Sequence, residues 1–92
     1  MIFMARNVFS VNAMIVGSDG SFYNVDDYPK AFDSKSYNDD VDKALARAEG
    51  EFSDAWGAMC KRDDRLIQTV TLMDVFGNQL DRKSRGNFPS EN

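Results

Sequence analysis

The strongest constraint in this sequence is an apolar stripe in its central part. From Val41 to Met59, apolar side chains recur every three or four residues, which is the period of an α-helix with one buried face. The stripe consists of Val41, Ala44, Leu45, Ala48, Phe52, Ala55, Trp56 and Met59. The pattern predicts one helix over 38–62, with Ser36 or Asn38 as its N-cap. Such a helix must bury its stripe against a second layer of structure.

The segment before the helix predicts a β-hairpin. Residues 7–16 alternate with the two-residue period of a half-buried strand, with Phe9, Val11, Ala13 and Ile15 on one face. A turn with two glycines follows at 17–20, and 21–25 is predicted as the return strand. Pro29 disfavours both a helix and a regular ladder, so 26–37 is predicted as a loop or a ragged edge.

The segment after the helix predicts a second hairpin. Residues 66–76 are rich in β-branched side chains, but their poor alternation predicts burial on both faces or a β-bulge. Gly77-Asn78 is a two-residue hairpin signal, and 79–83 is short and charged, as suits an edge strand. Residues 84–92 are predicted as a flexible tail.

Two hairpins around one helix predict an α+β fold. We expect residues 1–92 to form a single domain, in which an antiparallel four-stranded sheet carries the helix on one face. One helix cannot cover both faces of such a sheet. The other face is therefore either polar or covered by a partner, and Met14, Val16 and Met73 are candidates for exposed apolar residues there.

The composition excludes most enzyme chemistry. The chain of 92 residues contains no histidine and one cysteine, which removes histidine acid–base catalysis, Cys/His zinc sites and an internal disulfide. Its glycines are scattered over turns and form no phosphate-binding loop. We expect a protein that is not an enzyme and needs no metal or cofactor.

The net charge of −4 is unevenly distributed. Residues 18–64 hold twelve acids against six bases, whereas residues 65–92 hold three acids against four bases. The chain therefore lacks the basic surface that general adhesion to nucleic acid requires, and its acidic half suits a basic protein partner. A solitary cysteine, and a start whose charge follows a very short apolar patch, lead us to expect a cytoplasmic protein without a membrane anchor.

The segment 26–40 holds the candidate protein-binding residues. Its aromatic side chains stand among charged ones, a composition found at recognition surfaces, but they can equally fold back to cover one end of a small core. The candidates are Asp26, Asp27, Tyr28, Phe32, Tyr37, Asp39 and Asp40.

A small basic group is the remaining feature. Arg65 opens the third predicted strand, and Arg82, Lys83 and Arg85 lie at the end of the fourth. Pairing of these strands would bring the four cations to one end of the hairpin, where they can hold a nucleic-acid backbone. The alternative is that they protect an edge strand and form surface salt bridges.

In this arrangement the chain resembles the small anti-CRISPR proteins of phages and mobile elements. The resemblance lies in a compact acidic chain without catalytic residues, built as a hairpin at 7–25, a helix at 38–62 and a hairpin at 66–83. It is similar above all to inhibitors of type I-F surveillance complexes, and it implies stoichiometric binding to the crRNA-guided Cas proteins in the cytoplasm of a bacterial host. Target DNA would then be kept from binding or hybridising, by a monomer or a homodimer. The alternative function is a small nucleic-acid-binding regulator that uses the basic hairpin.

Overall fold

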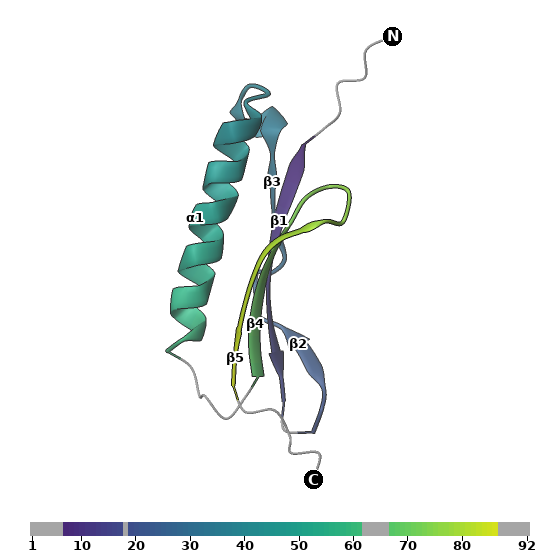
Figure 1. Ribbon diagram of the computed structural model, residues 1–92, viewed down its shortest axis with the longest axis vertical. Helices are drawn as coiled ribbons and strands as arrows, with labels where there is room; N and C mark the ends of the chain where they lie inside the picture. The colour runs from purple at the N-terminus through teal and green to yellow at the C-terminus, as the bar shows by residue number, and fades with distance from the viewer. Residues whose placement is uncertain (1–6, 18, 62–66, 87–92) are drawn as a thin grey trace.

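The predicted helix is present and packs against one face of an antiparallel sheet (Figure 1). The computed structural model describes residues 7–17, 19–61 and 67–86. Helix α1 spans Val41–Met59, and every residue of the predicted stripe is buried in the core or packed against it. The α+β class predicted from the sequence is therefore confirmed.

The helix begins three residues later than predicted, because the chain before it enters the left-handed region. Ser34–Tyr37 forms a short 3-10 helix, η1, after which Asn38 and Asp39 have φ angles of 57° and 63°. The N-cap is Asp40, whose Oδ1 accepts a hydrogen bond of 3.1 Å from the backbone N–H of Lys43. The predicted N-caps, Ser36 and Asn38, are wrong.

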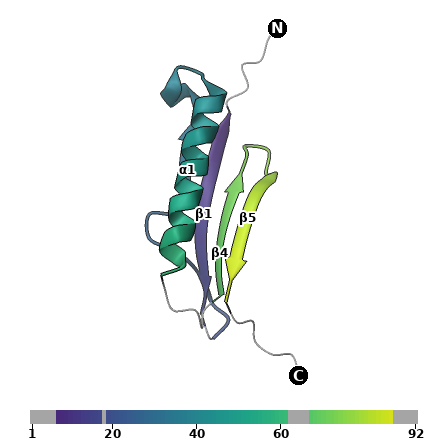
Figure 2. The same cartoon turned by 60° about the vertical axis from the view of Figure 1, so that its left-hand side comes forward.

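The sheet has five strands rather than the predicted four. Strand β1 (Val8–Val16) pairs along most of its length with β4 (Ile67–Met73), and β4 pairs with β5 (Gln79–Arg85) (Figure 2). On its other edge, β1 pairs with two short strands, β2 (Phe22–Asn24) and β3 (Lys30–Asp33). All of these pairings are antiparallel.

Strand β3 lies in the segment that was predicted as a loop or a ragged edge. β2 pairs with the second half of β1 and β3 with its first half, so together they act as one interrupted edge strand. The interruption is the loop 25–29, in which the N–H of Tyr28 donates to the carbonyl of Val25 at 3.0 Å. Pro29 lies in this loop rather than in a strand, as expected for a residue without an N–H.

The second hairpin differs from prediction in its turn. β4 ends at Met73, and the turn spans 74–78 because the Asp74 carboxylate accepts hydrogen bonds of 2.9 Å from the N–H groups of Phe76 and Asn78. The predicted bulge is present between Leu72 and Met73. β5 continues to Arg85, so residues 84–85 belong to the sheet rather than to a tail, and 87–92 lie outside the described residues.

The core lies between α1 and one face of the sheet. β1 contributes Phe9, Val11 and Ala13, while β4 contributes Val70 and Leu72. Gln68 is also buried on this face. A polar residue at a buried strand position explains why the alternation of this segment looked poor in the sequence.

The opposite face of the sheet, called the open face below, is not covered by any of the described residues (Figure 1). Along β1 and β4 its side chains are only partly buried. They include Met14, Val16 and Met73, which were predicted to lie there.

Candidate interaction surfaces

A groove runs along α1 beside strand β3. It has a volume of about 310 Å³ and is lined by Phe32, Ala46, Arg47, Gly50, Glu51 and Asp54. Gly50 leaves the groove open, because a Cβ atom at that position would meet no atom within 4 Å. We call this feature the helix groove.

Tyr28 makes a polar contact with Glu51, one of the residues that line the helix groove. Its hydroxyl donates a short hydrogen bond to Oε2 of Glu51, and Nζ of Lys30 lies 3.5 Å from the same oxygen and 5.1 Å from the centre of the tyrosine ring. Burial is the main cause that raises the pKa of Tyr28 to about 12, and the hydrogen bond to Glu51 adds to it, as do the charges of Glu51, Asp54 and Asp27. Three carboxylates from two segments thus act on one phenol.

This pKa predicts a loss of stability at high pH. The folded protein holds the Tyr28 proton to about pH 12, whereas an unfolded tyrosine releases it near pH 10, so this contribution is complete below pH 10 and is lost as the pH rises to 12. We expect the free energy of unfolding to fall by about 1–2 kcal/mol in this interval because of Tyr28. Urea unfolding of the wild type and of Tyr28→Phe measures it, since the difference between the two should shrink as the pH rises. Tyr23→Phe, at an exposed tyrosine, should behave as the wild type, and a constant difference for Tyr28→Phe would contradict the assignment.

The three predicted recognition aromatics pack against the core. Tyr28, Phe32 and Tyr37 are each partly buried and contact the hydrophobic cluster. Phe32 pairs with Phe9 across the strands and also lines the helix groove. This geometry agrees with the interpretation that these aromatics cover one end of the core, and their partly exposed edges stay available to a partner.

The predicted acidic residues are all exposed, but they form two separate groups. Asp26 and Asp27 lie in the loop 25–29, and the charge of Asp27 acts on Tyr28 near the helix groove. Asp39 and Asp40 lie at the start of α1. That point is about 16 Å along the helix axis from Glu51, given a rise of about 1.5 Å per residue.

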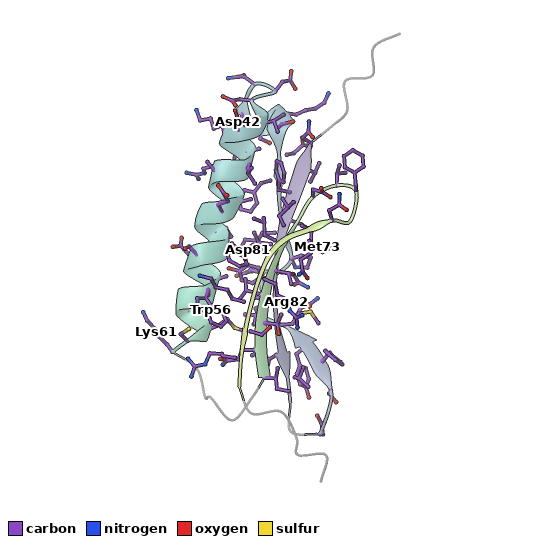
Figure 3. All side chains as sticks on the ribbon, in the orientation of Figure 1. Asp42, Trp56, Lys61, Met73, Asp81 and Arg82 are labelled. Atoms are coloured by element: carbon purple, nitrogen blue, oxygen red, sulfur yellow. The ribbon has the colours of Figure 1, made fainter. Side chains whose placement is uncertain are left out.

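The basic residues of β5 are divided between the two faces of the sheet. Lys83 and Arg85 lie on the helix side: Nζ of Lys83 is 5.9 Å from the centre of the Phe52 ring, and Nη1 of Arg85 donates a 3.1 Å hydrogen bond to the carbonyl of Cys60. Arg82 pairs with Thr71 and lies on the open face (Figure 3). Arg65 lies outside the described residues. The three described cations therefore do not form one patch.

Arg85 also supplies a charge that the helix itself lacks. The last turn of α1 contains no basic residue, and Lys61 lies beyond its end. The guanidinium of Arg85 instead contacts the carbonyl of the C-cap residue, Cys60, where the helix dipole is negative. The role of Arg85 in this structure is thus to stabilise the helix end.

The open face is hollowed near strand β2. The hollow has a volume of about 240 Å³ and is lined by Met14, Val16, Phe22, Thr69, Thr71, Gln79 and Arg82. Phe22 is 70% exposed at its rim, so the hollow combines apolar, hydroxyl and amide groups with a single cation.

The turn between β4 and β5 exposes a further aromatic side chain. Phe76 is 75% exposed, and neighbouring Val75 is 48% exposed. The turn is held by the Asp74 carboxylate, whose pKa is lowered mainly by its side-chain hydrogen bond with Asn78.

Sequence reasoning did not find several of these residues. Glu51 and Asp54 were not assigned to any site, although they flank the buried stripe at positions next to Phe52 and Ala55. Their partner, Tyr28, comes from a loop whose path along the sheet depends on the undetected strand β3. The open-face residues Thr69 and Thr71 were missed because Gln68, a polar residue on the buried face, obscures the alternation of this segment.

The described residues contain neither a metal-binding group nor a membrane-spanning helix. No three of their Cys, Asp or Glu side chains lie so that they could hold a metal ion. None of their helices is long and apolar enough to cross a membrane.

Comparisons of the chain with models of protein families, with curated proteins and with solved structures gave no match. The argument for a binding mode therefore rests on the surfaces of this chain.

Proposed function

We propose that this protein is a non-enzymatic inhibitor that binds a bacterial type I-F CRISPR-Cas surveillance complex and blocks its binding of target DNA. The choice of target rests on the resemblance of the chain to small anti-CRISPR proteins. The observation that carries the binding mode is the gathering of Asp27, Glu51 and Asp54 around Tyr28 at the helix groove.

This surface has the chemistry to occupy a site that normally holds nucleic acid. Carboxylates at its rim can pair with lysines or arginines of a Cas protein, and the partly buried ring of Phe32 offers an apolar contact inside the groove. Lys30 and Tyr28 hold Glu51 in place, so one of the three charges is already oriented before binding. Asp39 and Asp40, at the start of α1, form a second acidic group about 16 Å from Glu51 along the helix axis.

Binding of free nucleic acid is less well supported. It requires the basic residues of the second hairpin to act together, whereas Lys83 and Arg85 contact the helix side of the protein itself and Arg82 lies on the open face. We therefore retain the inhibitor as the proposed function.

The test uses a purified type I-F complex loaded with its guide RNA, with binding and target-DNA capture measured separately. The variant Asp27→Asn/Asp54→Asn removes two of the three carboxylates that act on Tyr28, and asparagine tolerates the positive φ of 73° at position 27. Its matched control, Asp42→Asn/Glu49→Gln, changes the net charge equally, from −4 to −2, at exposed helix positions outside the groove.

We expect the wild type to bind the complex and to prevent DNA capture. The groove variant should bind about tenfold or more weakly and the control within about threefold of the wild type, because each contacting charge contributes roughly 0.5–1 kcal/mol. Failure of the wild type to bind the complex would overturn the proposal. Equal weakening by both variants would reject the groove as the contact surface.

A further inference from the structure

We infer that the open face of the sheet is the interface of a homodimer, in which two copies pack face to face around a two-fold axis that runs along the strands. The inference does not depend on the proposed function. It rests on the charge, the area and the cross-strand register of this face.

Two copies can approach with least repulsion at the open face. Neither β1 nor β4 contains a charged residue, although the chain carries a net charge of −4 and 28% of its residues are charged. Helix α1, which carries four acidic residues, lies on the opposite side of the sheet (Figure 1). A face-to-face dimer therefore leaves both acidic helices, and both helix grooves, on its outer surfaces.

The area of the open face is sufficient for a weak dimer. Strands β1, β4 and β5 have nine, seven and seven residues, and the interrupted edge of β2 and β3 lies beside β1. At a spacing of about 4.8 Å they give a face of roughly 20 Å by 25 Å. Two such faces bury about 1,000 Å², which is near the lower limit for a specific interface. Stacked sheets pack in this way at a distance of about 10 Å.

The register makes the face complementary to a second copy of itself. Asn12, Thr71 and Arg82 form one row across β1, β4 and β5. On the far edge, β2 ends with Asn24 opposite Met14, and β3 pairs Ala31 with Ser10, so the loop 25–29 lies level with this row.

A two-fold axis between β1 and β4 reverses the order of the strands in the second copy. It places Asn12 over the partner copy's Thr71, and an amide and a hydroxyl can each donate and accept a hydrogen bond. It also places Arg82 over the loop 25–29 of the other copy, which carries the exposed Asp26. The one cation of the hollow thus faces the carboxylate of Asp26 twice in each dimer.

Sedimentation equilibrium of the purified full chain tests the inference directly. We expect the weight-average mass to rise toward that of two chains between about 5 and about 200 µM, as suits a weak interface of this size. A mass of one chain throughout this range would overturn the inference.

A matched pair of substitutions locates the interface. Ser10→Asp places a charge on the open face opposite Met73, whereas Ser53→Asp places the same charge on the exposed side of α1. We expect the first to raise the dimer dissociation constant by about tenfold or more and the second to leave it within about threefold. Equal values for the two variants would place the interface elsewhere.

A charge exchange at the edge of the interface tests how the two copies are oriented. Unlike Ser10→Asp, it introduces no charge near the centre of the open face. Arg82→Glu should raise the dissociation constant by about tenfold, and adding Asp26→Arg should restore it to within about threefold of the wild type. Position 26 is used because Asp27 has a positive φ that arginine rarely adopts. A dimer that Arg82→Glu weakens but Asp26→Arg does not restore would reject the axis along the strands.

Discussion

Substitution of Phe52 by alanine is expected to cost about 3–5 kcal/mol, a large share of the stability of a domain this small. Phe52 is only 4% exposed and is the largest side chain that the helix places in the core cluster. Its nearest buried neighbours on the helix, Ala48 and Ala55, are small and cannot move in to fill the cavity. Chemical unfolding followed by circular dichroism measures the change.

The control for this substitution is Phe76→Ala, which deletes the same ring from a position that is 75% exposed. We expect its unfolding free energy to stay within about 0.5 kcal/mol of the wild type. A similar loss for both variants would mean that the turn 74–78 packs against the fold in solution. A small loss for Phe52→Ala would contradict the core described here.

The periodicity of the sequence identified the helix and its buried stripe, but not the point where the helix begins. Asn38, Asp39 and Asp40 are all competent N-caps, so local chemistry alone does not choose among them. The choice is made by the left-handed conformation of Asn38 and Asp39, which these residue types tolerate. A right-handed or extended conformation at these two positions would have been equally compatible with the sequence.

Strand β3 was not predicted because four residues are too few to establish a period. The sequence indicated it instead through the length of the strand with which it pairs. The predicted strand at 7–16 is twice as long as the predicted return strand at 21–25, so half of its edge was left without hydrogen bonds. A buried central strand requires that edge to be paired, and β3 supplies the pairing with Val8–Val11.

Strand alternation alone would have predicted that the basic residues of β5 lie on two different faces of the sheet. Arg82 is one residue from Lys83 and three from Arg85, so it must lie on the opposite face from both. The sequence did not show which face of β5 is the one on the helix side. That depends on the register between β4 and β5, which the bulge beside Met73 shifts by one residue.

Replacement of the two helix glycines by alanine is expected to stabilise the protein. Gly50 and Gly57 are exposed in α1, neither has a positive φ, and a Cβ atom at either position would meet nothing within 4 Å. Each substitution should add about 0.5–1 kcal/mol, with the smaller gain at Gly57 near the helix end. The double variant should melt roughly 5–10 °C higher in a calorimetric scan.

The two glycines differ in position in a way that separates stability from binding. Gly50 lines the helix groove, whereas Gly57 does not, so alanine at 50 partly fills the surface proposed to contact the surveillance complex. If both variants are stabilised and only Gly50→Ala binds the complex more weakly, the glycine at 50 serves access to the groove at a cost in helix stability. If Gly50→Ala is not stabilised, its side chain is obstructed and the groove is narrower in solution than in the structure. Unchanged binding by a stabilised Gly50→Ala would show that the partner does not enter the groove at this turn of the helix.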